Sequence, residues 1–144
     1  MDVRFEKAGA ESLPLIQNIL KNNKLVYQDI NGANVELFCA YDNTSLVGVI
    51  GLEVFDTVAL LRSTCVKREY RQKGYGKTLV DKALERAKRL GVKELYLLTN
   101  SAKDFFEHIG FETVDRNDVP LSIQLTKEFA SYCPLTAACL KIFI

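Results

Sequence analysis

The sequence predicts one mixed α/β (α+β) domain over residues 1–144, with a mixed, mostly antiparallel sheet flanked by helices. Three observations support this prediction: a series of apolar runs separated by short turns, an amphipathic helix directly after them, and strands and helices that alternate toward the carboxyl end. A chain of 144 residues is long enough to bury a hydrophobic core, and neither an internal repeat nor a linker divides it.

The first half of the chain predicts a strand, a helix and a three-stranded meander. Residues 3–7 are typical of a short strand, and residues 9–25 place apolar side chains at helical spacing, with Pro14 in the first turn. Residues 25–34 contain Asn-Gly and predict a loop or a short helix. Three apolar runs follow, separated by turn residues, at 35–41, 46–55 and 58–66. Their spacing predicts an antiparallel meander.

The second half predicts alternating helices and strands. Residues 77–90 place apolar side chains on one face of a helix, and Gly91 is suited to end it. Residues 93–99 form an apolar run that predicts a strand buried on both faces. The remaining expected elements are a short helix at 101–110, a strand at 111–114, a helix at 119–130 and a last strand at 137–144.

Charge and hydropathy exclude several classes of function. The formal net charge is +1, so the whole molecule carries no field that favours nucleic acid or an anionic membrane. The longest apolar run, residues 46–52, is too short to span a bilayer. The amino end lacks a basic start followed by an apolar segment, so we expect no secretory signal and a cytoplasmic location.

The cysteine and histidine pattern predicts no metal site. Cys39, Cys65 and Cys139 lie in apolar surroundings typical of buried thiols, and Cys133 is the fourth cysteine. The chain has no Cys-x-x-Cys pair, and His108 is its one histidine. We therefore expect neither a zinc site nor a disulfide framework.

The stretch RQKGYGKTLV, residues 71–80, is the clearest candidate for a ligand site. A turn that leads into a helix leaves backbone N–H groups without partners, and the helix dipole adds positive partial charge there. Gly74 and Gly76 allow a ligand to approach the backbone, and Arg71, Lys73 and Lys77 add formal charge. A pyrophosphate fits such a turn. The spacing is neither that of a P-loop nor that of a dinucleotide fingerprint, and the alternative is a turn with solvated cations.

The pattern Arg71-x-x-Gly74-x-Gly76, between an apolar strand and an amphipathic helix, resembles the acetyl-CoA motif of the GCN5-related N-acetyltransferase (GNAT) family. The stretch SAKDFFEHIGFE is similar to the helix and Gly-Phe ending of that family. The resemblance implies the GNAT fold, in which two neighbouring strands splay into a V, and acetyl-CoA as cosubstrate. It also implies direct transfer of the acetyl group to an amine.

A closer resemblance covers residues 35–142. The stretches GLEVFDTVALLRSTCV, ELYLLTNSAKDFFEHIGF, VPLSIQLTKEF and CPLTAACLK resemble the small acetyltransferases associated with arsenic-resistance genes. Those proteins in turn resemble the acetyltransferase domain of N-acetylglutamate synthase. This likeness implies that the acceptor is a small amine, such as an amino acid or an amino-acid-like molecule.

The resemblance also implies roles for individual residues. The backbone of the turn would hold the pyrophosphate, the strand edge before it would pair with the pantetheine arm, and the opposite wall of the slot would contact the same arm. These cofactor-binding residues are Cys65, Val66, Arg71, Gln72, Lys73, Gly74, Tyr75, Gly76, Lys77, Thr78, Asn100 and Phe105. The backbone N–H of Val66 would also polarise the thioester carbonyl, as in an oxyanion hole.

Two charged residues in apolar strands are candidates for the acceptor side. An amine near pKa ~9–10 is mostly protonated at neutral pH, so a base must remove its proton. Glu53 is the candidate base, and the alternative is that it faces solvent on an alternating strand. Arg62 is the candidate clamp for a substrate carboxylate, and the alternative is that it pairs with Glu53 or Asp56.

One position departs from the family. Many members carry a tyrosine that protonates the leaving thiolate, where this chain has Phe106. Water, Tyr96 or Tyr132 could supply the proton instead, or the thiolate could leave unaided. Two other readings therefore stand beside the enzyme: a CoA-binding regulatory module without turnover, and an anion site on a protein-interaction domain. Exposed edge strands near the carboxyl end suggest a homodimer.

Overall fold

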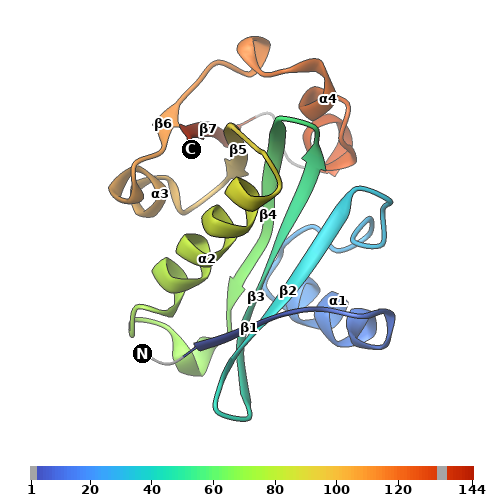
Figure 1. Cartoon of the computed structure of the whole chain (residues 1–144), viewed down its shortest axis with the longest axis vertical. Coiled ribbons are helices and arrows are strands. Elements are labelled where there is room, and N and C mark those ends of the chain that lie inside the picture. Colours follow the sequence, from blue (N-terminus) through green and yellow to red (C-terminus); the bar gives the residue numbers. More distant parts are fainter. Residues whose placement is uncertain (1–2, 133–135) are drawn as a thin grey trace.

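The computed structural model describes residues 3–132 and 136–144. Within these residues, seven strands form one sheet in the order β1-β2-β3-β4-β5-β7-β6 (Figure 1). The strands are β1 (Val3–Lys7), β2 (Val35–Asp42), β3 (Ser45–Phe55), β4 (Val58–Val66), β5 (Glu94–Thr99), β6 (Glu112–Thr113) and β7 (Ala138–Phe143). The α-helices are α1 (Leu13–Asn22), α2 (Tyr75–Arg89), α3 (Lys103–Ile109) and α4 (Leu121–Gln124). Shorter helical turns are η1 (Ala10–Ser12), η2 (Arg68–Tyr70), η3 (Arg116–Asp118) and the π-helical η4 (Glu128–Tyr132).

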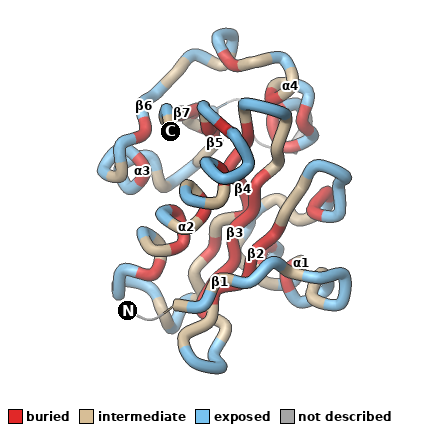
Figure 2. Tube along the Cα trace, viewed as in Figure 1, coloured by how far each residue is buried: buried red, intermediate tan, exposed pale blue. Residues whose placement is uncertain are grey.

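The predicted meander is confirmed. Strands β2, β3 and β4 pair antiparallel in sequence order, and β1 joins the edge of β2. Side chains of a strand point alternately to the two faces of the sheet, so β2 contributes to two layers of core. Phe38 and Ala40 pack in the cluster that includes α2. Leu37 and Cys39 pack in the cluster that includes α1. Figure 2 shows the buried residues along these central strands.

Helix α2 covers one face of the sheet, as its apolar pattern predicts. Leu79, Val80 and Ala83 are fully buried against the strands. Gly91 has φ +85°, a left-handed conformation that glycine adopts without strain, and it follows the helix directly. Leu90, which the pattern placed on the same face, is 38% exposed because it lies at the end of the last turn.

The opposite face of the sheet carries α1 and α4. Leu60 and Tyr96, from β4 and β5, pack in one cluster with Ile123 of α4 and Phe129 of η4. Leu97 of β5 packs on the α2 face, so β5 is buried on both faces, as its apolar run predicts. The α1 and α4 clusters lie on the same face, and this arrangement leaves room for a site between them.

The parallel pairing of β4 with β5 is short. It joins only Val58–Leu60 of β4 to Glu94–Tyr96 of β5, while β4 continues to Val66. Beyond Leu60 the two strands part, which confirms the V-shaped splay that the family resemblance implied. The pairing of β4 with β3 also slips between Val49 and Gly51, opposite Ser63, whose φ is +57°. The opened stretch of β4 therefore contains a bulge.

Two expected elements are shorter than the sequence suggested. The strand at 111–114 is reduced to the two residues of β6. The helix expected over 119–130 divides into α4 and η4. Thr126 explains the division, because its hydroxyl donates to the carbonyl of Ile123 at 2.7 Å and accepts from the N–H of Phe129 at 3.3 Å. These bonds replace the regular helical pattern at that point.

No helix in the described part of the chain has both the length and the apolar character needed to cross a membrane. Near the carboxyl end, β7 pairs with β5 on one side and β6 on the other. The edge strand there is β6, which is two residues long. The homodimer stays a prediction, and this short edge offers it little backbone.

Candidate active site

The turn between β4 and α2 is open to solvent. Gly74 precedes α2 with φ +87°, and Gln72 also has a positive φ of +63°. The residues of the turn that are exposed are Arg71, Gln72, Lys73 and Gly74. The first N–H groups of a helix have no acceptor within it, and the dipole of the 15-residue α2 adds positive partial charge at its start. The turn therefore fits the pyrophosphate that its sequence predicts.

Side chains around the turn hold it in place. The hydroxyl of Tyr75 donates to the carboxylate of Asp42, which ties the start of α2 to the end of β2. The same hydrogen bond raises the pKa of the Tyr75 hydroxyl above its ordinary value. Thr78 donates from its hydroxyl to the carbonyl of Gly74 at 3.2 Å, and Lys77 pairs with Asp81 at 2.9 Å on the exposed side of the helix.

The side chain of Arg71 is held by two hydrogen bonds. Its Nε donates to the carbonyl of Val66 at 2.9 Å, and its terminal nitrogen Nη2 donates to Oδ1 of Asn23 at 2.5 Å. Asn23 is the residue that ends α1. The guanidinium therefore links the turn to β4 and to the end of α1. The role of the Arg71 backbone in binding the pyrophosphate stays a prediction.

The last residue of β4 presents its backbone to the opened side of the sheet. The N–H of Lys67 donates to the carbonyl of Val47 at 2.8 Å, toward β3. Because N–H groups alternate in direction along a strand, the N–H of Val66 points away from β3. This orientation is the one required for Val66 to pair with an extended ligand in the splay.

Three segments converge on the start of α2. A Cβ atom added at Gly76 would lie 3.3 Å from Cζ of Phe105 and 3.9 Å from Cγ2 of Val66. Phe105 belongs to α3 and is 39% exposed, and Asn100 is exposed directly after β5. Val66 and Phe105, to which the family resemblance gives the two walls of a slot, therefore both lie next to the start of α2. The place of Asn100 in such a slot stays a prediction.

The thiol of Cys65 lies outside this slot. Its side chain is buried in the α1 cluster, and burial raises the pKa of the thiol, although Arg71 opposes the shift. Burial also raises the pKa of Cys139 to about 11. Cys39, Cys65 and Cys139 are buried, as predicted, and Cys133 lies outside the described residues. A buried thiol with a raised pKa makes a poor nucleophile.

Phe106 is a core residue. It is 6% exposed and makes edge-to-face contacts with Phe105 and Phe111, with ring centres 5.0 and 5.5 Å apart. Tyr96 is also buried, and burial raises the pKa of its hydroxyl, so it stays protonated at neutral pH. The side chain of Tyr132 lies outside the described residues.

Arg62 is the centre of a buried charge cluster. Its side chain is 0% exposed and contacts three carboxylates from separate segments. Asp29, from the loop after α1, binds both terminal nitrogens of the guanidinium at 2.5 and 2.9 Å. Glu53 of β3 accepts from Nη1 at 2.9 Å, and Oε2 of Glu128 in η4 lies 3.3 Å from Nε. Nε also lies 3.3 Å from the hydroxyl of Ser63.

The cluster carries more negative than positive charge. Burial alone would lower the pKa of Arg62, but its hydrogen bonds to Asp29 and the charges of Glu128, Asp29 and Glu53 raise the pKa above the ordinary value. The guanidinium is therefore always charged. Three carboxylates face one guanidinium, so the formal charge of the cluster is 1 − 3 = −2.

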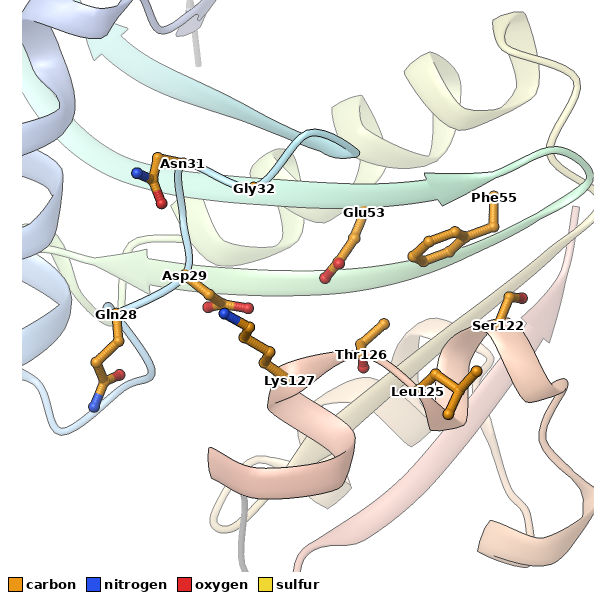
Figure 3. A pocket seen from close by; sticks show the side chains of 10 residues that line it. All are labelled: Gln28, Asp29, Asn31, Gly32, Glu53, Phe55, Ser122, Leu125, Thr126 and Lys127. Carbon is orange, nitrogen blue, oxygen red and sulfur yellow. The ribbon is translucent and has the colours of Figure 1, made fainter.

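A pocket of about 380 Å³ opens onto this cluster (Figure 3). It has three walls: the loop after α1, the end of β3, and the segment formed by α4 and the start of η4. The lining residues are Gln28, Asp29, Asn31, Gly32, Glu53, Phe55, Ser122, Leu125, Thr126 and Lys127. Figure 3 shows Glu53 projecting from β3 into the pocket, opposite Thr126 of the third wall.

These contacts show which partners the two charged strand residues have, while their roles stay predictions. Arg62 pairs with Glu53, as one alternative held, whereas Asp56 is exposed in the turn after β3 and is not among its partners. A substrate carboxylate could bind Arg62 only by displacing one of its three carboxylates. Glu53 does not face open solvent, because its side chain is 13% exposed and lines the pocket.

Sequence reasoning missed Asp29, Glu128 and Lys127. The one available signal was Arg62 itself, since a buried guanidinium requires carboxylate partners. The partners come from a loop and from an irregular helical turn, where no periodic pattern marks them. Among the residues that the structure describes, no group of three or more His, Cys, Asp or Glu side chains could hold a metal ion.

Comparisons with known proteins agree with this geometry. The model of the acetyltransferase (GNAT) family matches residues 10–111. An amino-acid acetyltransferase of Aeromonas salmonicida is 36% identical over 81 residues, which are 55% of this chain and 18% of that protein. An uncharacterised N-acetyltransferase of Chlorobaculum tepidum is 31% identical over 109 residues, which are 74% of this chain and 67% of that one.

The fold is shared with solved structures of the same kind. N-acetylglutamate synthase of Neisseria gonorrhoeae, complexed with coenzyme A and L-arginine, superposes with a TM-score of 0.81 at 17% identity. The superposition covers 99% of this chain and 33% of that one, so the chain spans about a third of that enzyme. Together with the family match over most of the sequence, these findings show that the chain belongs to the GNAT family of acetyltransferases.

Proposed function

We propose that this acetyltransferase moves the acetyl group of acetyl-CoA to the amine of a small, amino-acid-like acceptor by direct transfer. The observation that carries the proposal is the opening of β4 beyond Leu60. The phosphate turn lies at one end of the opened strand, after Val66. The acidic pocket lies toward the other end, at Arg62. A donor that runs along the edge would thus bring its reactive end toward the acceptor pocket.

The likeness to the Aeromonas amino-acid acetyltransferase supports an amino-acid-like acceptor. The negative charge next to the pocket independently supports an amine as the acceptor. An acceptor amine arrives mostly as a cation, and the cluster behind the pocket carries a formal charge of −2. The pocket volume of about 380 Å³ suits a molecule of amino-acid size rather than a protein tail.

Glu53 is the residue we assign as general base. Asp29 uses both carboxylate oxygens on Arg62, whereas Glu53 uses only Oε1. Within the described residues, Oε2 of Glu53 has no hydrogen-bond donor, and the side chain lines the pocket. Glu53 can therefore accept a proton from the acceptor amine without releasing Arg62.

The chemical step then needs few protein groups. The neutral amine nitrogen attacks the thioester carbonyl carbon, the new C–N bond forms and the C–S bond breaks. Glu53 takes the first proton from the ammonium before the attack and releases it to solvent. The second proton leaves the nitrogen for Glu53 as the amide forms, and the sulfur leaves as a thiolate, whose ordinary pKa near ~8.5 makes unaided departure tolerable. The N–H of Val66 is the donor we assign to the thioester carbonyl.

The slot beside the turn gives a test of donor binding. We expect Gly76→Val to weaken CoA binding about tenfold or more, because its side chain would fill the space next to Phe105 and Val66. Calorimetric titration with CoA measures the dissociation constant. Gly91→Ala is the control for a general loss of stability, since Gly91 has φ +85° and a Cβ added there meets nothing within 4 Å. If Gly76→Val bound CoA with unchanged affinity, CoA would not bind in the space between Gly76, Phe105 and Val66.

Turnover itself is tested by the release of free thiol from acetyl-CoA with a panel of amino acids and simple amines. We expect release that depends on the acceptor. CoA binding without release for any acceptor would favour the regulatory module instead. Absence of CoA binding in the wild-type protein would leave only the anion site on an interaction domain. The regulatory module is a real alternative because Phe106, which is buried where many family members carry a tyrosine, cannot donate a proton to the leaving thiolate.

A further inference from the structure

The cation on the wall of the acidic pocket is Lys127, not Arg62. Lys127 is the one positively charged residue among the ten that line the pocket. Its side chain is exposed, and no carboxylate lies within ion-pair distance of it in the part of the chain that the structure describes. Arg62, by contrast, is fully buried behind the pocket and contacts three carboxylates.

The backbone around Lys127 is fixed on both sides. Thr126 is hydrogen-bonded to Ile123 and Phe129, and Glu128 turns inward to Arg62. Lys127 therefore stays at the pocket while its neighbours point into the protein. Figure 3 shows its side chain on the same side of the pocket as Asp29. Negative groups (Asp29 and Glu53) and one positive group thus share a single small cavity.

The remaining wall is apolar. Phe55, at the end of β3, and Leu125, the residue that caps the end of α4, both line the pocket. Leu125 is 70% exposed, so a large apolar side chain faces solvent at the pocket. A ligand with an apolar substituent would cover it, and burial of that surface would favour binding.

These three features fit a zwitterion with an uncharged side chain. We propose that the acceptor is an α-amino acid whose ammonium faces Glu53, whose carboxylate binds Lys127, and whose apolar side chain lies over Phe55 and Leu125. An acidic side chain would bring a second carboxylate. Lys127, the one cation among the lining residues, is already used by the first, so Asp29 and Glu53 would repel the second. The inference rests on the proposed function, because it names the substrate class of that same pocket.

Equilibrium binding tests this inference without turnover. Calorimetry in the presence of saturating CoA measures the affinity for L-leucine, for 3-methylbutylamine, which is leucine without its carboxylate, and for L-glutamine and L-glutamate. We expect the wild-type protein to bind L-leucine. We also expect it to bind L-glutamate at least about tenfold more weakly than L-glutamine, which is the neutral analogue of L-glutamate. Equal affinity for glutamine and glutamate would overturn the charge argument.

Lys127→Met removes the cation and keeps the length of the side chain. We expect it to weaken L-leucine binding about threefold to tenfold and to leave 3-methylbutylamine unchanged. Lys127→Glu should weaken L-leucine further. Lys88→Met, at an exposed lysine of α2 on the other face of the sheet, is the matched control and should change neither affinity.

The outcomes separate the two proposals. The assignment of Lys127 is wrong if Lys127→Met leaves the affinity for L-leucine unchanged, or if it weakens L-leucine and 3-methylbutylamine equally. The zwitterionic acceptor is wrong if the wild-type protein does not bind L-leucine. If leucine binds as expected but neither leucine nor any other amine releases thiol from acetyl-CoA, the assignment of Glu53, Lys127 and the apolar wall to a zwitterion stands, and the proposed function fails. If other amines release thiol while leucine does not bind, the function stands and the inference fails.

Discussion

Replacing Arg62 with methionine is expected to lower the free energy of unfolding by about 3–5 kcal/mol and the melting temperature by about 10–15 °C. The side chain of Arg62 is 0% exposed and neutralises carboxylates that are themselves 8–13% exposed. Methionine fills similar space but leaves three buried negative charges facing one another. Removing one partner of a buried ion pair is costly because the remaining charge has lost both water and its counterion.

Two further variants make this prediction specific. Arg86→Met removes the guanidinium that pairs with Glu36 at 3.1 Å, but that pair is 35% and 18% exposed, so we expect a loss of no more than about 1 kcal/mol. Combining Arg62→Met with Asp29→Asn and Glu128→Gln should recover part of the lost stability, because fewer charges remain unpaired. Thermal unfolding followed by circular dichroism measures all of these. A melting temperature of Arg62→Met within about 2 °C of wild type would contradict the burial argument.

This result would also settle the role of Arg62. As a substrate clamp, Arg62 would affect mainly the Michaelis constant of the acceptor, and its loss would leave stability nearly unchanged. As the counterion of Asp29, Glu53 and Glu128, it joins the loop after α1, the sheet and η4 into one pocket. The contacts favour the second role. We therefore expect the main role of this charge cluster to be the arrangement of the three segments, because a buried ion pair adds little net stability over a well-packed apolar replacement.

The parts of the fold that were predictable depend on local patterns. The apolar face of α2 and Gly91, which ends the helix, are both read from a short stretch of neighbouring residues. The glycine turn at Gly74 and Gly76 is likewise read from adjacent residues. The three runs of the meander are joined by short turns, so their antiparallel pairing follows directly from the sequence. The splay of β4 from β5 came from the family resemblance, since no pattern in either strand marks where their pairing stops.

The parts that were not predictable depend on contacts between distant segments. Arg62 lies 33 residues from Asp29 and 9 residues from Glu53, and its third partner, Glu128, comes from the segment after β6. A charge in an apolar strand shows that partners must exist but not which ones. The division of the last helix at Thr126 had a local cause, because threonine competes for backbone hydrogen bonds, yet apolar spacing alone continued the helix through it.

Glu53→Gln is expected to lower kcat by about 10²–10⁴ at pH 7, with the acceptor that gives the fastest thiol release. Glutamine keeps the length of the side chain and can still accept from Arg62 through its amide oxygen, so the pocket should remain folded. It cannot take the amine proton. Glu85→Gln, on the exposed side of α2, is the matched control and should leave kcat unchanged.

The pH profile tells a base apart from a residue that only shapes the pocket. As pH rises from 7 toward 10, the fraction of free amine in solution rises by itself, because the amine pKa lies near ~9–10. The need for Glu53 falls with it, so the ratio of wild-type to Glu53→Gln rates should shrink steadily over this range. A ratio that stays constant with pH, or a loss of less than about threefold at pH 7, would mean that another group takes the proton. Asp29→Asn would then be the next variant to measure, since Asp29 is the other carboxylate that lines the pocket.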